Sequence, residues 1–372
     1  MKTNIPERIA ALREAMRQQK VDAYIIPSSD PHLSEYPADR WKSREWISGF
    51  TGSAGTIVVT ADKAGLWTDS RYFLQAASQL EGSGIELYKL ALPETPSITE
   101  FLLHELHAGQ AVGLDGQTYS AAEASALANK LSRKEIKLDT SADLIEGIWK
   151  DRPAVPGNPI FEMPEALSGA SVHEKLDLIN NQLRSEGADC LILAALDEIA
   201  WTFNIRGTDV TYNPVVVSYA FVSEDESVLF IKPEKLTAEI TEHLKKEGVT
   251  LAEYSMIQRY LSRLPENSRV FVDMNKTNVS LYDAIPGNCT IVEGISPANH
   301  LKSTKNETEI KGFQNAVVKD GVALTKFYIW LEKQMAEGAQ VTEISAAEKL
   351  TALRAEQPQY IMDSFGTICG YA

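Results

Sequence analysis

The chain has 372 residues, which at about 100–200 residues per domain predicts two or three compact units. Hydrophobic residues make up 44% and charged residues 23%, a composition that excludes wholesale disorder. Asp and Glu number 51 against 36 Lys and Arg, and the net charge of -15 would repel a phosphate backbone, so we expect no nucleic-acid partner.

The first residues, MKTNIPERIAALREAM, carry charges where a signal peptide would need an apolar core. No apolar run reaches the roughly 18 residues of a membrane span. We therefore expect a cytoplasmic protein with no membrane partner. The three cysteines, Cys190, Cys289 and Cys369, form no C-x-x-C pair, and we expect them to be reduced and structural.

A helix followed by a strand opens the chain and then recurs. Residues 7–20 place apolar side chains at helical spacing, and residues 21–27 have the pattern of a short buried strand. A second apolar-striped helix follows His173, and a second strand follows at 188–193. From Val21 to Ala188 the offset is 167 residues.

The repetition continues beyond the first strand. Residues 46–52 match residues 201–207 once a few residues are deleted, and a β-rich stretch follows each, at 56–60 and 214–219. A repeat of this length suits a duplicated α/β domain rather than a solenoid unit. Residues 151–159 hold three prolines and a glycine, which favour a linker between the two domains.

A third unit is predicted to begin near Lys302. Residues 307–335 form a long helical pattern with a broad apolar face, and a second helix is expected from Glu343 to Gln357. A strand-like stretch at 364–369 then lies close to the last residue. Because a strand needs partners, we expect this unit to be incomplete.

Two motifs have simple structural interpretations. Gly49, Gly52 and Gly55 loosely resemble a phosphate-binding loop, but they lead into a strand rather than a helix, so we expect tight turns that use positive φ. His104 and His107 lack the spacing of a zinc pair, and a solvated helix face is the simpler interpretation.

Acidic and basic residues near strand ends are the remaining candidates. Asp197, Glu198 and Asp209 complete no acid/base constellation, and we expect them to make structural hydrogen bonds or interdomain contacts. Arg71 follows the strand-like residues 66–68, where a long cation can leave the domain. Spacing alone favours a surface salt bridge for Arg71 and a solvated loop position for Glu35.

Seven segments together resemble the cytosolic-type Xaa-Pro aminopeptidases (aminopeptidase P). They occur in the family's order and span nearly the whole chain: residues 34–36, 47–56, 66–76, 196–201, 204–214, 305–310 and 341–347. The resemblance implies an α/β fold of two tandem, related creatinase N-terminal-like domains with mixed sheets. The first helices of a truncated pita-bread metallopeptidase domain would follow.

The implied boundaries follow from the linker and the repeat. The N-terminal domain would span residues 1–152, the linker 153–164, the middle domain 165–299 and the start of the catalytic domain 300–372.

The resemblance also implies an activity: release of the first residue from peptides with proline in second position. Two divalent metal ions, commonly manganese, would activate water, held by two Asp, one His and two Glu. All five ligands would follow Ala372, so no catalytic or metal-binding residue is assigned to this chain, and we expect it to be inactive alone. Arg71 would contact the substrate, and the enzyme would be a homodimer.

Two alternatives stay open from the sequence. One is a non-catalytic creatinase-like binding or scaffold module. The other is a different pita-bread hydrolase, such as a prolidase or a creatinase.

Overall fold

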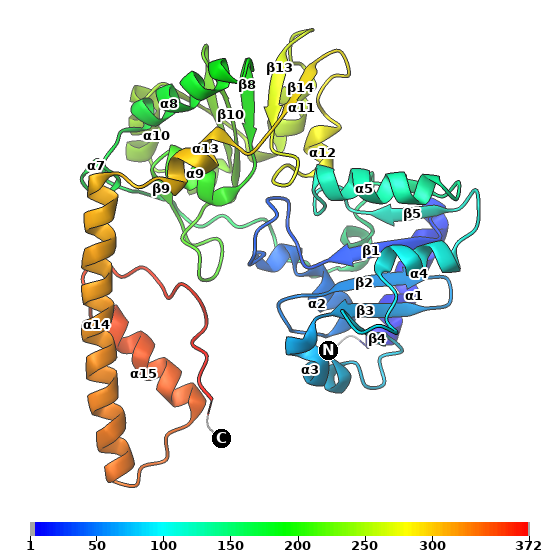
Figure 1. The fold of residues 1–372 in the computed structure, drawn as a ribbon, viewed down its shortest axis with the longest axis horizontal. Coiled ribbons are helices and arrows are strands. Elements are labelled where there is room, and N and C mark those ends of the chain that lie inside the picture. The colour runs from blue at the N-terminus through cyan, green and yellow to red at the C-terminus, as the bar shows by residue number, and fades with distance from the viewer. Residues whose placement is uncertain (1–3, 371–372) are drawn as a thin grey trace.

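The computed structural model describes residues 4–370. Two sheet domains lie side by side, and a long helix near the C-terminal end of the chain extends from the edge of one of them (Figure 1). Within the described residues, no helix combines the length and apolar character needed to cross a bilayer.

The N-terminal domain is a six-stranded mixed sheet in the order β4-β3-β2-β1-β5-β6. β2 is antiparallel to both β1 and β3, whereas the other neighbours are parallel. Its strands are β1 (Ala23–Pro27), β2 (Thr56–Thr60), β3 (Ala64–Thr68), β4 (Glu86–Lys89), β5 (Ala111–Leu114) and β6 (Lys137–Asp139).

Helices cover both faces of this sheet. Because side chains alternate along a strand, Tyr24 and Ile26 pack against α1, α2, α3 and α6, while Ala23 and Ile25 pack against α4 and α5. The helices are α1 (Ile5–Gln19), α2 (Ser43–Ser48), α3 (Phe73–Gln79), α4 (Ile98–Glu105), α5 (Ala121–Ser132) and α6 (Leu144–Ile148), with 3₁₀ turns η1 (Asp39–Trp41) and η2 (Ser70–Tyr72).

The middle domain has a second six-stranded sheet, in the order β12-β11-β10-β8-β13-β14. Its strands are β8 (Cys190–Leu193), β10 (Ser218–Ser223), β11 (Ser227–Ile231), β12 (Val249–Ala252), β13 (Arg269–Val272) and β14 (Thr290–Glu293); β7 (Phe161–Glu162) and β9 (Ile205–Arg206) form a separate ribbon. Its helices are α7 (Glu165–Ser168), α8 (Val172–Ser185), α9 (Leu196–Thr202), α10 (Ala238–Lys246), α11 (Ile257–Leu261) and α12 (Val279–Tyr282), with η3 (Pro233–Lys235) and η4 (Tyr254–Met256).

The two sheets have the same strand order and the same directions. Ile25 pairs with Val58 in the first sheet as Ile192 pairs with Phe221 in the second, so Ile25 and Ile192 are equivalent and lie 167 residues apart. The predicted duplication and the α/β fold class are therefore confirmed. The second β-rich stretch was placed too early, because the strand begins at Ser218 rather than at Pro214.

The two domains meet through equivalent loops. The N–H of Ala121 donates to the carbonyl of Thr277, and the N–H of Val279 donates to the carbonyl of Tyr119, both at 2.9 Å. Strand register makes Ala121 equivalent to Val279 and Tyr119 equivalent to Thr277. The interface therefore has approximate twofold symmetry, like the self-complementary contact of a homodimer.

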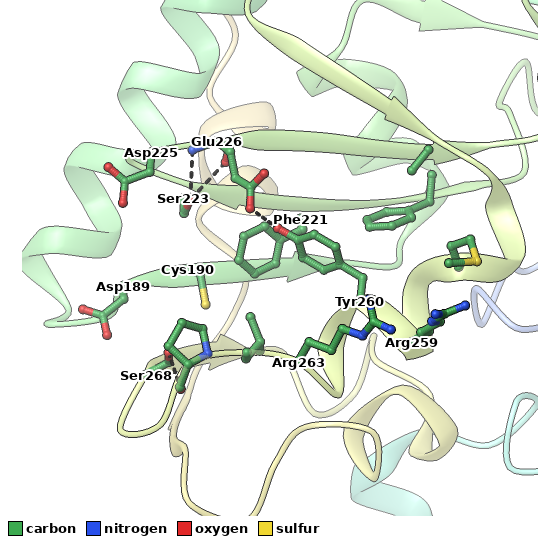
Figure 2. Close-up of a pocket in the computed structure, with 15 residues that line it drawn as sticks. Asp189, Cys190, Phe221, Ser223, Asp225, Glu226, Arg259, Tyr260, Arg263 and Ser268 are labelled. Atoms are coloured by element: carbon green, nitrogen blue, oxygen red, sulfur yellow. Dashed lines mark hydrogen bonds between the residues drawn. The ribbon is translucent and has the colours of Figure 1, made fainter.

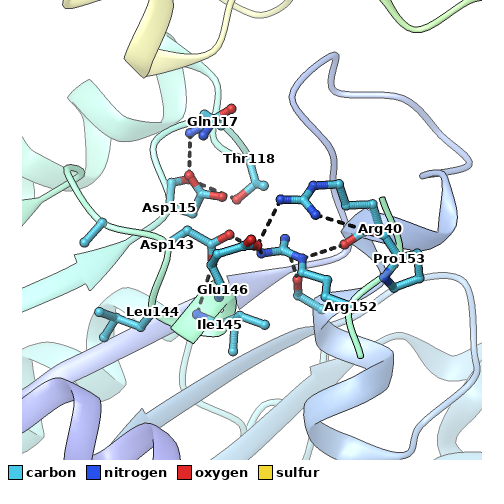
Figure 3. A network of polar contacts seen from close by, with 12 residues as sticks. Arg40, Asp115, Gln117, Thr118, Asp143, Leu144, Ile145, Glu146, Arg152 and Pro153 are labelled. Carbon is cyan, nitrogen blue, oxygen red and sulfur yellow. Dashed lines mark hydrogen bonds and ion pairs between the residues drawn. The ribbon is translucent and has the colours of Figure 1, made fainter. Parts of the chain in front are cut away.

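A polar network fastens the start of the linker to the N-terminal domain (Figure 3). Arg152 donates to the carbonyl of Arg40 at 2.9 Å and to Glu146 at 2.8 Å, and it also pairs with Asp143. Arg40 in turn donates to Glu146 and to the carbonyl of Pro153. These contacts hold the chain where it leaves the first domain.

The last part of the described chain is helical, with α13 (Pro297–Ser303), α14 (Glu307–Ala336) and α15 (Glu343–Ala355). α15 packs on the C-terminal half of α14 through Phe327 and Leu350, while Phe313, Val317 and other apolar side chains of α14 stay exposed. The predicted strand at 364–369 is wrong: this stretch forms no strand, because no strand lies beside it among residues 4–370.

Candidate functional site

A cavity of about 620 Å³ lies where the two sheet domains meet. The N-terminal domain lines it with the loop after β1, the turn before β2, the turn after β3 and the start of α5. The middle domain contributes the loop after β13, through Asn275 and Lys276. Arg71 and Glu35, which the sequence analysis considered separately, both line this cavity.

Arg71 lies on η2, directly after β3. The carboxylate of Asp69 accepts the backbone N–H of Arg71 and so starts this turn. The same carboxylate accepts from Arg71 Nε and Nη2, both at 2.8 Å, which is a bidentate ion pair. These hydrogen bonds lower the pKa of Asp69 and raise that of Arg71, so both groups are charged at neutral pH.

The ion pair with Asp69 orients the Arg71 guanidinium but uses only part of its hydrogen-bonding capacity. The Arg71 side chain is 66% exposed, and its guanidinium lies 5.1 Å from the ring of Tyr72. Within residues 4–370, the Nη1 group has no hydrogen-bond acceptor, so it can donate to an incoming carbonyl or carboxylate. The salt bridge expected from spacing alone is present, and it leaves the group able to bind a ligand.

The glycine loop beside Arg71 is shaped by close packing. A Cβ on Gly52 would lie 2.2 Å from the ring of Phe50 and 2.8 Å from that of Tyr72. Only Gly49, at φ 73°, uses the positive φ that we expected for all three glycines; Gly52 and Gly55 are needed for space. Tyr72 also hydrogen-bonds Ser53 at 2.7 Å, which joins this loop to the Arg71 turn.

Arg44 is a buried cation that the sequence analysis missed. It donates to the carbonyls of Phe50 and Gly52 and, at 2.9 Å, to the hydroxyl of Ser28. It thereby holds together two of the loops that line the cavity. Burial lowers the pKa of Arg44 to about 10, and the guanidinium remains charged at neutral pH. Nothing local in the sequence distinguishes Arg44 from a solvated helical arginine.

The loop that carries Glu35 is held by an inward-facing turn. The carboxylate of Asp30 accepts the N–H groups of His32 and Ser34, at 2.9 and 3.0 Å. Glu35 itself is exposed and faces the same cavity as Arg71. The N-terminal domain thus lines the cavity with two carboxylates, Glu35 and Glu123, and one guanidinium, Arg71.

His32 is the second group that sequence reasoning missed, and it fixes the angle between the domains. Its ring is buried in the middle domain, where Nδ1 donates to the carbonyl of Ala194 at 2.8 Å. Nε2 then accepts from the hydroxyl of Tyr254 at 2.9 Å, and the ring lies 4.4 Å from that of Tyr219. Burial lowers the pKa of His32 to about 3, so the ring is neutral.

The acidic residues of the middle domain have structural partners. Asp209 is buried, pairs with Lys235 and accepts the N–H of Val217 at 2.8 Å. Asp197 pairs with Lys302, and Glu198 accepts from Asn299, so both connect α9 to α13. Burial raises the pKa of Glu198 to about 7.

The described residues do not fit a metal centre. Between residues 4 and 370, no group of three or more His, Cys, Asp or Glu side chains is arranged to hold a metal ion. His104 is exposed and bonds its neighbour Glu105 at 2.9 Å. We therefore derive no metal-dependent step from these residues. What they can do is bind and orient a polar ligand at Arg71.

Comparison with known proteins adds the following findings. The creatinase/prolidase N-terminal domain family matches residues 8–148, and a second family of the same description matches residues 151–309. A probable Xaa-Pro aminopeptidase P of Botryotinia fuckeliana is 39% identical over 98% of this chain, and aminopeptidase P2 of Arabidopsis thaliana is 36% identical over 99% of it. The chain covers 57% of each of these relatives.

A solved structure is similar over almost the same extent. It is an X-prolyl aminopeptidase of Caenorhabditis elegans, described as a cytosolic enzyme with a di-nuclear active site. Its TM-score with this chain is 0.91 at 30% identity, covering 98% of this chain and 62% of the nematode protein.

Proposed function

The chain belongs to the Xaa-Pro aminopeptidase P family, and on this basis we propose that it forms the N-terminal and middle domains of a metal-dependent peptidase. The full-length enzyme would release the first residue from peptides with proline in second position. The similarity to proteins named Xaa-Pro aminopeptidase P, over nearly the whole chain, carries this proposal. A scaffold module or a prolidase is less well supported by these relatives.

The catalytic centre, in this proposal, lies in further residues that follow Ala372. Its support is that the relatives are longer than this chain and that the nematode protein has a di-nuclear active site. The exposed apolar residues of α14 give physical support, because a patch of Phe313, Val317 and Val318 is unfavourable in water unless another segment covers it. Two manganese ions, a homodimer and a cytoplasmic location complete the proposal.

The proposed role of the described residues is to shape the substrate cleft. Arg71 would donate from Nη1 to a carbonyl or carboxylate oxygen of the peptide, with Asp69 holding the guanidinium in place. Arg44 and His32 would act indirectly, as positioning residues that fix the loops and the angle between the domains.

The first test uses the full-length protein and the residue 1–372 fragment. With added manganese, we expect the full-length protein to release the first residue of a short X-Pro peptide and the fragment to release none above the blank. Activity of the fragment would place catalytic residues inside this chain and contradict the proposal. Failure of the full-length protein on every X-Pro peptide would contradict it as well.

The second test concerns Arg71. We expect Arg71→Ala in the full-length protein to lower kcat/KM by about ten- to hundred-fold, since a charge-assisted hydrogen bond contributes roughly 1.5–3 kcal/mol. Metal content and melting temperature should change little, because the side chain is exposed. Arg71→Lys should restore activity only partly, since an ammonium group lacks the planar fork. If Arg71→Ala kept full activity, Arg71 would have no role in substrate binding, and its only role would be the surface salt bridge with Asp69.

A further inference from the structure

A second hollow of about 650 Å³ lies on the middle domain, beside α11. None of its lining residues lines the cavity that contains Arg71. Tyr260 of α11 forms the accessible aromatic part of its lining and covers the buried rings of Phe221 and Phe230, which it meets edge-to-face at ring distances of 5.0 and 5.2 Å (Figure 2). An aromatic hollow of this size falls within the range of small-molecule sites.

The equivalent position of the N-terminal domain is packed differently. Phe230 pairs with Ala252 across β11 and β12, as Trp67 pairs with Tyr88 across β3 and β4. In the N-terminal domain the ring of Tyr88 stacks on Trp67 at 4.0 Å and fills the space. The methyl group of Ala252 is too small to stack in this way: Tyr260 covers Phe230 instead, which is 0% exposed, and Ala252 itself lines the hollow.

Unpaired cations lie at one side of the hollow. Arg259 lies on α11 and Arg263 lies two residues after its end, and Figure 2 shows both on the side of the hollow away from Asp189. Over residues 4–370, neither guanidinium has a hydrogen-bonded or ion-paired acid. Two such arginines beside one hollow are notable in a chain where 51 Asp and Glu outnumber 36 Lys and Arg.

Acidic groups lie on the opposite side, which limits the ligand. Figure 2 shows Asp189 and Asp225 away from the two arginines. Glu226 is engaged by the hydroxyl of Tyr260. A ligand with negative charge at both ends would be repelled by these acids, whereas one with a single anionic end can place it at the arginines.

We propose that this hollow binds small amphipathic monocarboxylates, with an aromatic or branched apolar body against Tyr260, Ala252 and Met256. The carboxylate accepts hydrogen bonds from Arg259 and Arg263, whose planar forks suit its two oxygens. The apolar body covers the accessible apolar surface of Tyr260, Ala252 and Met256, and the size of the hollow accommodates a single ring with a short chain.

The probe for the test is 4-phenylbutyrate, titrated calorimetrically into the residue 1–372 protein. We expect saturable 1:1 binding with Kd on the order of 0.1–1 mM, as suits a ligand of this size. The neutral analogue 4-phenylbutan-1-ol should bind at least about ten-fold more weakly, because it cannot form charge-assisted hydrogen bonds. Inorganic phosphate should not bind, because it lacks an apolar body.

Two variants locate the site. The double substitution Arg259→Gln and Arg263→Gln should weaken 4-phenylbutyrate at least about ten-fold, while the control Arg133→Gln, on an exposed arginine elsewhere, leaves Kd unchanged. Ala252→Tyr should abolish binding, because it places in the hollow the side chain that Tyr88 provides at the equivalent position of the N-terminal domain. Both arginines are exposed, so the double variant tests the proposal even if Ala252→Tyr misfolds.

Three outcomes would overturn the proposal. One is the lack of saturable binding up to about ten times the highest expected Kd. Another is binding that survives the double arginine variant unchanged, which would place the ligand elsewhere, for example on the apolar side of α14. The third is equal binding of 4-phenylbutyrate and phosphate, which would reduce the site to a nonspecific anion contact.

Discussion

In each domain, an ion pair lies on the turn that follows the third strand of the sheet in chain order, β3 or β11. The order of the acidic and basic residues is reversed between the two turns. Asp69 and Arg71 pair after β3, and Lys232 and Glu234 pair at the equivalent positions after β11. Each pair spans two residues across a 3₁₀ turn, η2 or η3. The duplication kept the backbone and the pairing, yet the charges were exchanged. The fold therefore constrains the turn, and the site determines which charge faces outward.

The surroundings of the two turns account for this difference. Arg71 faces the cavity between the domains, whereas Glu234 lies beside the linker, where a Cβ on Gly157 would be 3.2 Å from its carboxylate. An isolated pair of exposed charges contributes only about 0–1 kcal/mol to stability. Stability therefore gives little preference for either order of the two charges. A functional requirement can determine whether the acidic or the basic residue comes first.

The largest expected effect concerns the contact that His32 makes across the interface between the domains. His32→Ala should lower the free energy of unfolding by about 3–5 kcal/mol, because it leaves a void and two unpaired polar partners, the carbonyl of Ala194 and the hydroxyl of Tyr254. Chemical denaturation followed by fluorescence measures this change. His32→Gln should recover part of the loss through its amide.

The control for this prediction is His107→Ala, an exposed histidine of the N-terminal domain, which should stay within about 0.5 kcal/mol of the parent. A small effect of His32→Ala would mean that the symmetric backbone contacts alone hold the domains together.

The second prediction concerns a variant in which the acidic and basic residues of the Asp69–Arg71 pair are exchanged. In the full-length protein, the double variant Asp69→Lys with Arg71→Glu should keep an ion pair across the turn and a melting temperature close to that of the parent. Its kcat/KM should fall by about a hundred-fold or more, because attraction for a substrate oxygen becomes repulsion. Steady-state kinetics on an X-Pro peptide checks this.

The matched control exchanges the middle-domain pair through Lys232→Asp with Glu234→Arg, and kcat/KM should be unchanged. Equal loss of activity in both double variants would show that the turns act through folding, and an active first variant would remove Arg71 from the substrate contacts.

The sequence predicted the repeated framework well because repeated elements carry local signals. The helix–strand pattern and the 167-residue offset identify Ile25 and Ile192 as equivalent without any structure. Residues 214–219 were misjudged because an apolar run of β-branched residues resembles a strand. Val215 and Val217 are buried instead in a cluster with Trp41 of the N-terminal domain.

The parts of the site that could not be predicted depend on distant partners. His32 bonds a carbonyl 162 residues away, and Arg44 is buried because two loop carbonyls turn toward it. A neutral buried histidine and a solvated one have the same local sequence. Arg71 and Glu35 were recognised singly, whereas their shared cavity depends on the packing of the loops after β1 and β3.

The smallest effect concerns two equivalent aspartates, Asp115 after β5 and Asp273 after β13. Each accepts the N–H of the residue two positions on, at 3.0 Å. Their second oxygens differ: Asp273 accepts the N–H of Ser296 at 3.3 Å, whereas Asp115 lies near Asp143 (Figure 3). Burial, together with the charge of Asp143, raises the pKa of Asp115 to about 7.

The sign of the pH dependence follows from this raised pKa. Between about pH 4 and 7, Asp115 holds a proton in the folded state that the unfolded state releases, so stability falls as pH rises through this window. Asp115→Asn removes the ionisation and should gain about 2 kcal/mol at pH 8 and almost nothing at pH 4. This figure is about half of the full linkage value, because the residue is only partly buried.

Denaturation midpoints at several pH values measure the effect, and Asp273→Asn is the matched control. Its amide nitrogen would face the N–H of Ser296, so this variant should lose about 1 kcal/mol at pH 8. If Asp115→Asn destabilised the protein equally at pH 4 and pH 8, the carboxylate of Asp115 would be a stabilising acceptor for the Gln117 N–H, and the two equivalent loops would be electrostatically alike.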